Sequence, residues 1–396
     1  MKPLQGIRIA DFTVHAAGPF CTHMLSQLGA ECIKIESALR PDIFRKPHAV
    51  YGRTGPASFD QVASNKSSIR LNLKKPEGIR IARQLVAISD VAAESFRAGV
   101  MTRLGLGYDM LKGVKPDIVM VSVSSSGQTG PDSHFAGYAP LFGAWGGIGY
   151  LTGYGDGPPV EMRHVMDHSV GMNAALATVA ALHQRRRTGK GAHIDVAARE
   201  VASSLIGEAV MAVSTGTKLE RMGNEDYRRA PHGVYATREP DRWLTISVGT
   251  DDQWQALLSI MDRQDLGGQA FASEQARHAE RAALDRIVSE WCATQFADET
   301  AGRLQNAGVP AHVSWNTQDI VSDPHLQERG AIVEVAELDG GTRSAVGFPA
   351  RFSVSDQPSI DRGTPRLGEQ EQYVYGELLG MDTRQYEELV EQQVIY

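Results

Sequence analysis

The sequence predicts an α/β protein with a parallel, doubly wound sheet and a second, smaller α+β domain. Extended apolar runs alternate with helical segments through the first half of the chain, as in proteins with parallel sheets. This alternation stops near residue 205, and strand signals return at residues 331–335. We therefore expect a large domain over residues 1–205, a small domain over 225–325, and a return to the large domain over 330–396.

The first elements of the chain predict a βαβ unit. Residues 7–12 and 31–36 are strand-like, and residues 19–28 between them are helical, with Pro19 in the first turn. The loop after the first strand lacks the GxGxxG pattern of dinucleotide-binding proteins. A nicotinamide dehydrogenase, the first activity that such a fold suggests, therefore loses its main support.

The following elements continue the alternation. Residues 68–73 and 118–123 predict strands, residues 76–88 predict a helix, and residues 91–93 are short and extended. Residues 135–155 are uncharged but rich in glycine and poor in aliphatic side chains. We expect loop and close-packed backbone there rather than a membrane-spanning segment.

A long helix is predicted over residues 170–187. Its expected packing face carries Met172, Leu176, Val179 and Leu182. Asp167 stands at the N-terminal end of this helix, where the helix dipole and unpaired N–H groups favour a carboxylate. Asp167 fits either a simple helix cap or an ionised nucleophile, and these residues alone favour the cap.

Composition excludes several classes of protein and of site. The chain carries 40 Lys and Arg against 47 Asp and Glu, for a net charge of −7, so we expect no nucleic-acid partner. Its three cysteines have no CxxC spacing, which fits a reducing cytoplasm without disulfides. His164 and His168 have no accompanying ligand cluster, so no metal site is expected. No signal peptide is readable, and no membrane association is expected.

Short motifs that occur in order along nearly the whole chain provide a further signal. They are Gly18-Pro19 and residues 28–36, 65–74, 94–99, 103–106, 187–191, 231–235, 308–310, 323–324, 329–330 and 367–369. In this number and order they resemble the class III CoA-transferases, of formyl-CoA transferase and carnitine CoA-transferase type, which are related to α-methylacyl-CoA racemase. Each motif alone would be a weak signal.

The resemblance implies a Rossmann-like large domain, a small domain and a dimer of two interlocked chains. It also implies that Asp167 attacks an acyl-CoA thioester, that an aspartyl-CoA thioester forms, and that a small carboxylic acid then takes the CoA. Coenzyme A thioesters are then substrates, with succinyl-CoA, a frequent donor in the family, as a candidate donor, and no cofactor is permanently bound. The partner chain is a second copy or, alternatively, a homologous subunit in a hetero-oligomer.

By position, the resemblance assigns coenzyme A contacts to loops at one edge of the sheet. The candidates are Asn72, Leu73, Lys74, Ser95, Phe96, Arg97 and Arg103. We add Arg40 and Arg45 from the loop after the second strand, as cations for phosphate or adenine. Ser95 stands where the family often has Asn, and Ser37 stands where formyl-CoA transferase-type members have an adenine-stacking Arg, so the adenine contacts stay open.

The acyl pocket separates two activities. His15 lies in the loop that lines this pocket in the family. Racemase-type members carry a His-Asp pair where this chain has Tyr138-Ala139, and tyrosine is the transferase-like residue. CoA transfer is therefore the first hypothesis and an acyl-CoA racemase or epimerase the second. A noncatalytic CoA-binding subunit is the third, and the retained Asp167 argues against it.

The acid substrate stays open at this point. An apolar pocket for a bulky acid and an ordinary packed core are both compatible with Phe142, Trp145, Tyr150, Met162 and Met166. The glycines of residues 143–149 fit either an oxyanion site of backbone N–H groups or tight turns.

Overall fold

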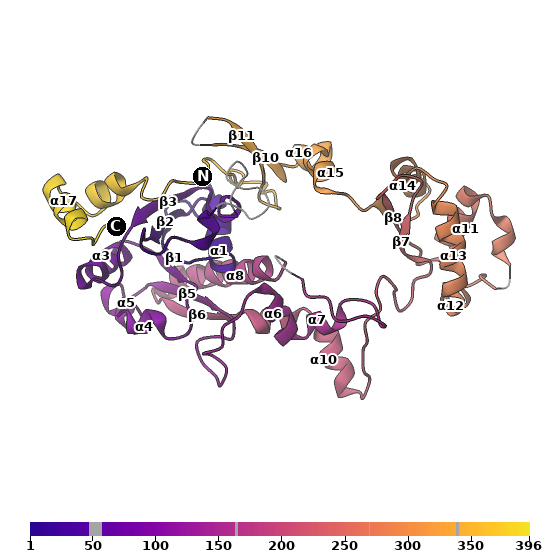
Figure 1. Cartoon of the computed structure of the whole chain (residues 1–396), viewed down its shortest axis with the longest axis horizontal. Coiled ribbons are helices and arrows are strands. Elements are labelled where there is room, and N and C mark those ends of the chain that lie inside the picture. Colours follow the sequence, from indigo (N-terminus) through magenta and orange to yellow (C-terminus); the bar gives the residue numbers. More distant parts are fainter. Residues whose placement is uncertain (47–57, 163–164, 269, 338–339) are drawn as a thin grey trace. The chain divides into compact units, whose positions relative to one another are not determined.

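The computed structural model describes residues 1–46, 58–162, 165–268, 270–337 and 340–396 (Figure 1). The chain forms two compact units. The first unit comprises residues 1–149, 161–218 and 323–396, and the second comprises residues 150–160 and 219–322.

The first unit is built on a six-stranded parallel sheet with strand order β3-β2-β1-β4-β5-β6. Its strands are β1 (Arg8–Phe12), β2 (Glu31–Glu36), β3 (Lys66–Arg70), β4 (Val91–Glu94), β5 (Val119–Ser124) and β6 (Ala192–Ala197). The predicted parallel α/β sheet is confirmed. Because the strand order reverses between β1 and β4, the loops that follow these two strands diverge and leave a crevice at the carboxyl edge of the sheet.

One face of the sheet is covered by α1 (Ala17–Gln27), α6 (Ala139–Gly146), α8 (Val165–Thr188) and α9 (Ala198–Ser204). Helices α1 and α8 pack closely because Gly171 leaves room for the neighbouring backbone. A β-carbon at Gly171 would lie 2.7 Å from the carbonyl oxygen of Ala17. The buried side chains at this contact include Cys21, Leu25 and Val170.

The packing face predicted for α8 was wrong at most of its positions. Met172, Leu176 and Val179 are 45%, 69% and 36% exposed. The helix packs instead through Val170, Gly171, Ala174 and other small residues, because these allow the α1 backbone to approach.

The opposite face is covered by α3 (Pro76–Ala87), α5 (Tyr108–Val114), the π-helix η3 (Gln372–Leu378) and α17 (Thr383–Glu391). Tyr375 and Ile395 from the end of the chain pack in one core with Ile33 and Ile69 of β2 and β3. The N–H of Asn72 donates to the carbonyl oxygen of Val394 at 2.8 Å. The C-terminal segment therefore completes the core that the first strands begin.

Residues 135–155, predicted to be loop, contain two helices. Helix α6 is followed by α7 (Ile148–Leu151). The glycines serve close packing here, since a β-carbon at Gly146 would lie 2.2 Å from the β-carbon of Ala202 in α9. The other short elements of the first unit are η1 (Ile43–Arg45), α2 (Asp60–Ala63), α4 (Val100–Arg103), α10 (Gly207–Ser214), α16 (Pro324–Glu328) and the antiparallel pair β10 (Ile332–Ala336) and β11 (Thr342–Val346).

The second unit is an α+β structure around an antiparallel three-stranded sheet with order β7-β8-β9. Its elements are β7 (His232–Ala236), β8 (Trp243–Ser247), α11 (Asp251–Met261), η2 (Gln264–Gly267), α12 (Glu274–Ala279), α13 (Arg281–Cys292), α14 (Ala297–Asn306), β9 (Ala311–Val313) and α15 (Thr317–Ser322). Its core includes Trp254, Leu257 and Leu284. Among the described residues of the whole chain, no helix has the length and apolar character needed to span a membrane.

Candidate active site

A cavity of about 150 Å³ lies where the loops after β1 and β4 diverge. Its walls are residues 14–18 after β1, residues 95–97 after β4, and residues 123–125 at the end of β5. Residues 133 and 135–138 close one side, and Phe142, Asp167 and Ala198 contribute from α6, α8 and α9. The topology of the sheet therefore brings segments distant in sequence to one site.

The loop after β1 is anchored on buried charges. Asp11, Lys34 and Lys66 are fully buried, and the ammonium of Lys66 lies 3.1 Å from a carboxylate oxygen of Asp11. The hydroxyls of Thr13 and Thr22 also donate to Asp11. Burial by itself raises the pKa of Asp11, but Lys66, Lys34 and the Thr13 hydrogen bonds outweigh it and lower the pKa to about 2.

A second buried pair holds the tip of the same loop. The ammonium of Lys34 lies 3.6 Å from a carboxylate oxygen of Asp42 and donates to the carbonyl oxygen of Thr13 at 2.6 Å. The same Asp42 oxygen accepts from the N–H of His15 at 3.1 Å. His15 has φ of 68°, a left-handed conformation that residues with a β-carbon seldom adopt. The buried pair of Lys34 and Asp42 therefore holds the loop in a strained backbone conformation.

The loop after β4 is tied to the first loop by Ser95. Its hydroxyl accepts from the N–H of Val14 at 2.8 Å and donates to the carbonyl oxygen of Val14 at 3.0 Å. The preceding residue, Glu94, is buried and accepts from the N–H of Phe96 at 2.7 Å. Burial raises the pKa of Glu94 to about 7, with a further contribution from Asp195, although bonds from Ser122 and Phe96 oppose the shift.

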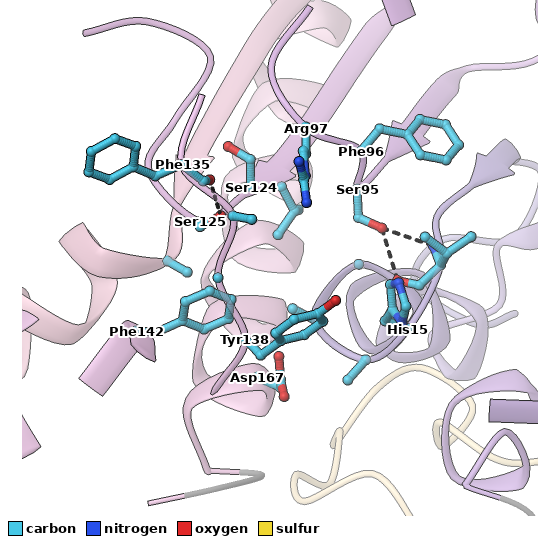
Figure 2. A pocket seen from close by; sticks show the side chains of 18 of the residues that line it. His15, Ser95, Phe96, Arg97, Ser124, Ser125, Phe135, Tyr138, Phe142 and Asp167 are labelled. Atoms are coloured by element: carbon cyan, nitrogen blue, oxygen red, sulfur yellow. Dashed lines mark hydrogen bonds between the residues drawn. The ribbon is translucent and has the colours of Figure 1, made fainter. Parts of the chain in front are cut away.

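Asp167 lies half-buried in the first turn of α8 and faces the cavity. Figure 2 shows Asp167 and Tyr138 at the wall of this cavity, with His15 beside the ring of Tyr138. The rings of His15 and Tyr138 meet edge to face, with their centroids 6.2 Å apart. The cavity thus brings together Asp167, His15, Ser95, Phe96, Arg97 and Tyr138 from the residues that the sequence singled out.

The other candidates lie outside the lining of this cavity. Arg45 pairs with Glu36 at 2.6 Å and stacks on the ring of Phe59. The amide of Asn72 donates to the carbonyl oxygen of Gln393, while its oxygen accepts from the N–H of Lys74. Leu73 is half-buried against the core of the C-terminal segment. Arg40, Lys74 and Arg103 are exposed on loops or a short helix that follow β2, β3 and β4.

His164 and His168 are the two histidines that the sequence analysis considered as metal ligands. His168 packs edge to face on Phe20, with the ring centroids 4.3 Å apart. His164 lies outside the described residues. Across the residues that are described, no group of three or more His, Cys, Asp and Glu side chains is arranged to hold a metal ion.

Comparison with known proteins decides the family. The model of the family described as CoA-transferase family III matches residues 4–371. This chain belongs to that family.

Two curated relatives of this CoA-transferase come from Chloroflexus aurantiacus. One, named succinyl-CoA–D-citramalate CoA-transferase, is 32% identical over 96% of this chain and 95% of its own length. The other, named succinyl-CoA–L-malate CoA-transferase beta subunit, is 31% identical over 99% of this chain and 98% of its own length. A solved CAIB/BAIF family protein from Brucella suis has a TM-score of 0.87 and 31% identity, covering 95% of this chain and 99% of that one.

Sequence reasoning missed several groups that shape the site of this CoA-transferase. Ser124, the last residue of β5, and Ser125, which follows it, line the cavity, and the hydroxyl of Ser124 is buried without a hydrogen-bond partner among the described residues. Hydroxyl residues directly after the apolar run of β5 were an available signal. Asp42 and Lys34 gave no such signal, because their pairing depends on the tertiary fold. The glycines of residues 143–149, considered for an oxyanion site, lie outside the cavity lining.

Proposed function

We propose that this enzyme transfers CoA from an acyl-CoA to a free carboxylic acid through a covalent intermediate on Asp167. A carboxylate oxygen of Asp167 attacks the thioester carbonyl, the C–S bond breaks, and CoA leaves as thiolate. The thiolate then attacks the Asp167 carbonyl of the resulting anhydride and expels the donor acid, which leaves an aspartyl-CoA thioester.

The second half of the reaction reverses these steps with the acceptor. The acceptor carboxylate attacks the aspartyl thioester and expels the thiolate, and the thiolate attacks the acceptor's carbonyl in the new anhydride. Asp167 leaves as carboxylate and the product is the new acyl-CoA. Thiolate and carboxylates exchange places, so no net proton is taken up or released.

The position of Asp167 is the observation that carries this proposal. It lies in the first turn of α8 and lines a cavity at the point where the strand order reverses. The helix dipole favours its ionised, nucleophilic form, and the half-buried setting limits its hydration. Ligands of open parallel sheets bind at such crevices.

We further propose succinyl-CoA as the donor and short dicarboxylic acids as acceptors. The relatives named for D-citramalate and L-malate support this class. The cavity volume of about 150 Å³ agrees, since a protein cavity of roughly this size accommodates a molecule such as benzene rather than a long acyl chain.

Coenzyme A itself is proposed to lie along the loops at the carboxyl edge of the sheet. Arg97 is exposed at the cavity, and Arg40, Lys74 and Arg103 are exposed on neighbouring segments of the same edge. Their cations suit the phosphates of coenzyme A. Arg45 and Asn72 are proposed to act indirectly, since their side chains hold Glu36 and the C-terminal segment.

The enzyme is proposed to be a homodimer. Helix α8 exposes Leu176, and α10 exposes Val210, Met211 and Val213, each more than half accessible in the single chain. Apolar surface of this kind supports association. Light scattering should give twice the mass of the chain, and Leu176→Glu with Met211→Glu should lower it. A monomeric wild type, or pairing only with a homologous chain, would contradict the proposal.

Peptide mass spectrometry tests the covalent step. Purified enzyme incubated with succinyl-CoA and no acceptor should carry an adduct on the peptide that contains Asp167. Asp167→Asn should abolish the adduct and turnover while leaving the melting temperature within a few degrees of wild type. Wild-type turnover in Asp167→Asn would refute the assignment, and exchange of an α-hydrogen with solvent deuterium without an acceptor would favour a racemase.

A further inference from the structure

The cavity beside Asp167 offers few positive groups to an anionic acid. Among the described residues that line it, only His15 and Arg97 have side chains that can carry positive charge. Much of the remaining wall is apolar, including Phe96, Phe135 and Phe142. An ionised carboxylate that enters such a wall must find a donor, because a charge transferred from water into an apolar site is costly unless it is paired.

The backbone of His15 is held by the buried pair of Asp42 and Lys34. Its N–H donates to Asp42, which is 5% exposed and lies beside the fully buried ammonium of Lys34. The second oxygen of Asp42 accepts from the N–H of Phe44. This holds His15 in the left-handed region at φ of 68°. Strain of this kind persists only where surrounding contacts impose it, and it concentrates at functional sites.

The imidazole of His15 is oriented by aromatic edges. It meets Tyr138 and Phe44 at interplanar angles of 85° and 83°. No hydrogen bond joins its ring nitrogens to another described residue, and the side chain is exposed toward the cavity. The ring is therefore held in place while its nitrogens stay available to a ligand.

His15 and Arg97 occupy different parts of the cavity. Figure 2 shows His15 beside Tyr138, while Arg97 comes from the loop after β4. Arg97 belongs to the segment proposed to contact coenzyme A. Of these two side chains that can carry positive charge, His15 is the one left for the second carboxylate of an acid whose first carboxylate reacts at Asp167.

We propose that His15 is a specificity-determining residue that binds the second carboxylate of a dicarboxylic acyl group, with Asp42 as its positioning residue. This inference rests on the proposed function and adds to it a residue that recognises the acid. An acid of equal length with a methyl group in place of that carboxylate would leave His15 without its ligand and is transferred less efficiently.

The test compares two acceptors that differ only at this group. L-malate and 3-hydroxybutanoate have the same four-carbon hydroxy-acid chain, and the second has a methyl group where malate has its second carboxylate. We expect wild-type kcat/KM to favour L-malate, and His15→Gly to reduce this preference roughly 10- to 100-fold, the loss of one hydrogen bond to a charged group. His15→Asn, which keeps a donor, should retain part of the preference.

Glycine is chosen because it keeps the left-handed backbone while removing the ring. His325→Ala, an exposed histidine on α16, is the matched control and should leave the preference unchanged. Asp42→Asn should lower the preference in the wild type, through the KM for L-malate, but should not change it further in His15→Gly. A change of equal size in both backgrounds would show that Asp42 acts independently of His15.

An independent readout separates this inference from the proposed function. Propionyl-CoA has no second carboxylate, so it should still form an adduct on Asp167 in both wild type and His15→Gly. If the adduct forms and the preference for L-malate is absent from wild type or unchanged in His15→Gly, the role of His15 is wrong and the covalent mechanism stands. If wild type forms no adduct with any acyl-CoA, the proposed function itself fails.

Discussion

The two loops that form the cavity rest on buried carboxylates with opposite electrostatic surroundings. Asp11, at the end of β1, is paired with Lys66 and lies near Lys34, and its pKa is lowered to about 2. Glu94, at the end of β4, has hydrogen bonds from Phe96 and Ser122 but no ion pair with another described residue, and burial raises its pKa to about 7. Both side chains are at most 2% exposed.

The difference shows that burial alone does not decide the charge of a group at the sheet edge. A nearby ammonium keeps Asp11 ionised at every physiological pH, whereas Glu94 changes its protonation near neutrality. The carboxylate that anchors the loop after β1 therefore keeps its charge across this pH range. The carboxylate that anchors the loop after β4 gains or loses its charge near neutral pH. Substitutions at the two carboxylates can test this contrast directly.

The largest effect is expected from removing the charge of Asp11. Asp11→Asn would leave Lys66 buried without a counter-charge, which costs about 3 to 5 kcal/mol of the free energy of unfolding. Urea denaturation measures it, with Glu77→Gln at an exposed pair as the matched control, expected to change stability by less than about 1 kcal/mol. If Asp11→Asn and Glu77→Gln lowered the free energy of unfolding equally, burial of the ion pair would not explain the cost at Asp11.

A smaller, pH-dependent effect is expected at Glu94. Because its folded pKa is raised from 4.5 to about 7, the folded state holds the proton more tightly, and this group lowers stability as pH rises from about 4.5 to 7. Glutamine cannot ionise, so Glu94→Gln should abolish this loss of stability with rising pH. The free energies of unfolding of variant and wild type should then differ little at pH 4.5 and by up to about 3 kcal/mol at pH 8. Denaturation at both pH values measures it, and a constant difference would disprove it.

The sign is opposite for Asp11. Its lowered pKa gives a stabilisation that is fully present above 3.8 and is lost as pH falls through about 2. Between pH 5 and 8 the contribution of Asp11 is therefore constant, and the pH dependence in that window separates the two carboxylates.

The smallest effect is expected at the bridge between the loops. Ser95→Ala removes both hydrogen bonds to Val14 and should cost about 1 to 2 kcal/mol. Faster hydrogen exchange at the Val14 amide would locate the loss at the bridge. Ser204→Ala, which removes one hydrogen bond within α9, is the control and should leave that amide unchanged.

Much of the sheet was predictable because its strands are apolar runs, as in Val119–Ser124. The start of β3 was placed too late, at residue 68 instead of Lys66, because charged residues are rare in buried strands. The buried ammonium of Lys66 meets the carboxylate of Asp11 and donates to Thr22 and to the carbonyl oxygen of Pro19. An ion pair between distant residues cannot be read from hydropathy.

Site residues could be predicted from the sequence where they belong to a family motif. They could not where tertiary packing determines which groups a side chain contacts. Asp167, Tyr138 and the segment of Ser95, Phe96 and Arg97 were found through the family resemblance, and all line the cavity. Arg45 has the charge expected of a phosphate contact, yet its guanidinium pairs with Glu36 and stacks on the ring of Phe59. The sequence shows that a cation is present but not which anion it meets.

The return of the C-terminal segment to the sheet has a consequence for synthesis on the ribosome. The hydroxyl of Tyr375 donates to the carbonyl oxygen of Arg70, a residue 305 positions earlier in the chain. At the usual 5 to 20 residues per second, roughly 15 to 60 s pass between the translation of these two residues. During that interval Ile33 and Ile69 lack the side chains of Tyr375 and Ile395 that share their core. The nascent protein thus carries an incomplete apolar layer through most of its translation.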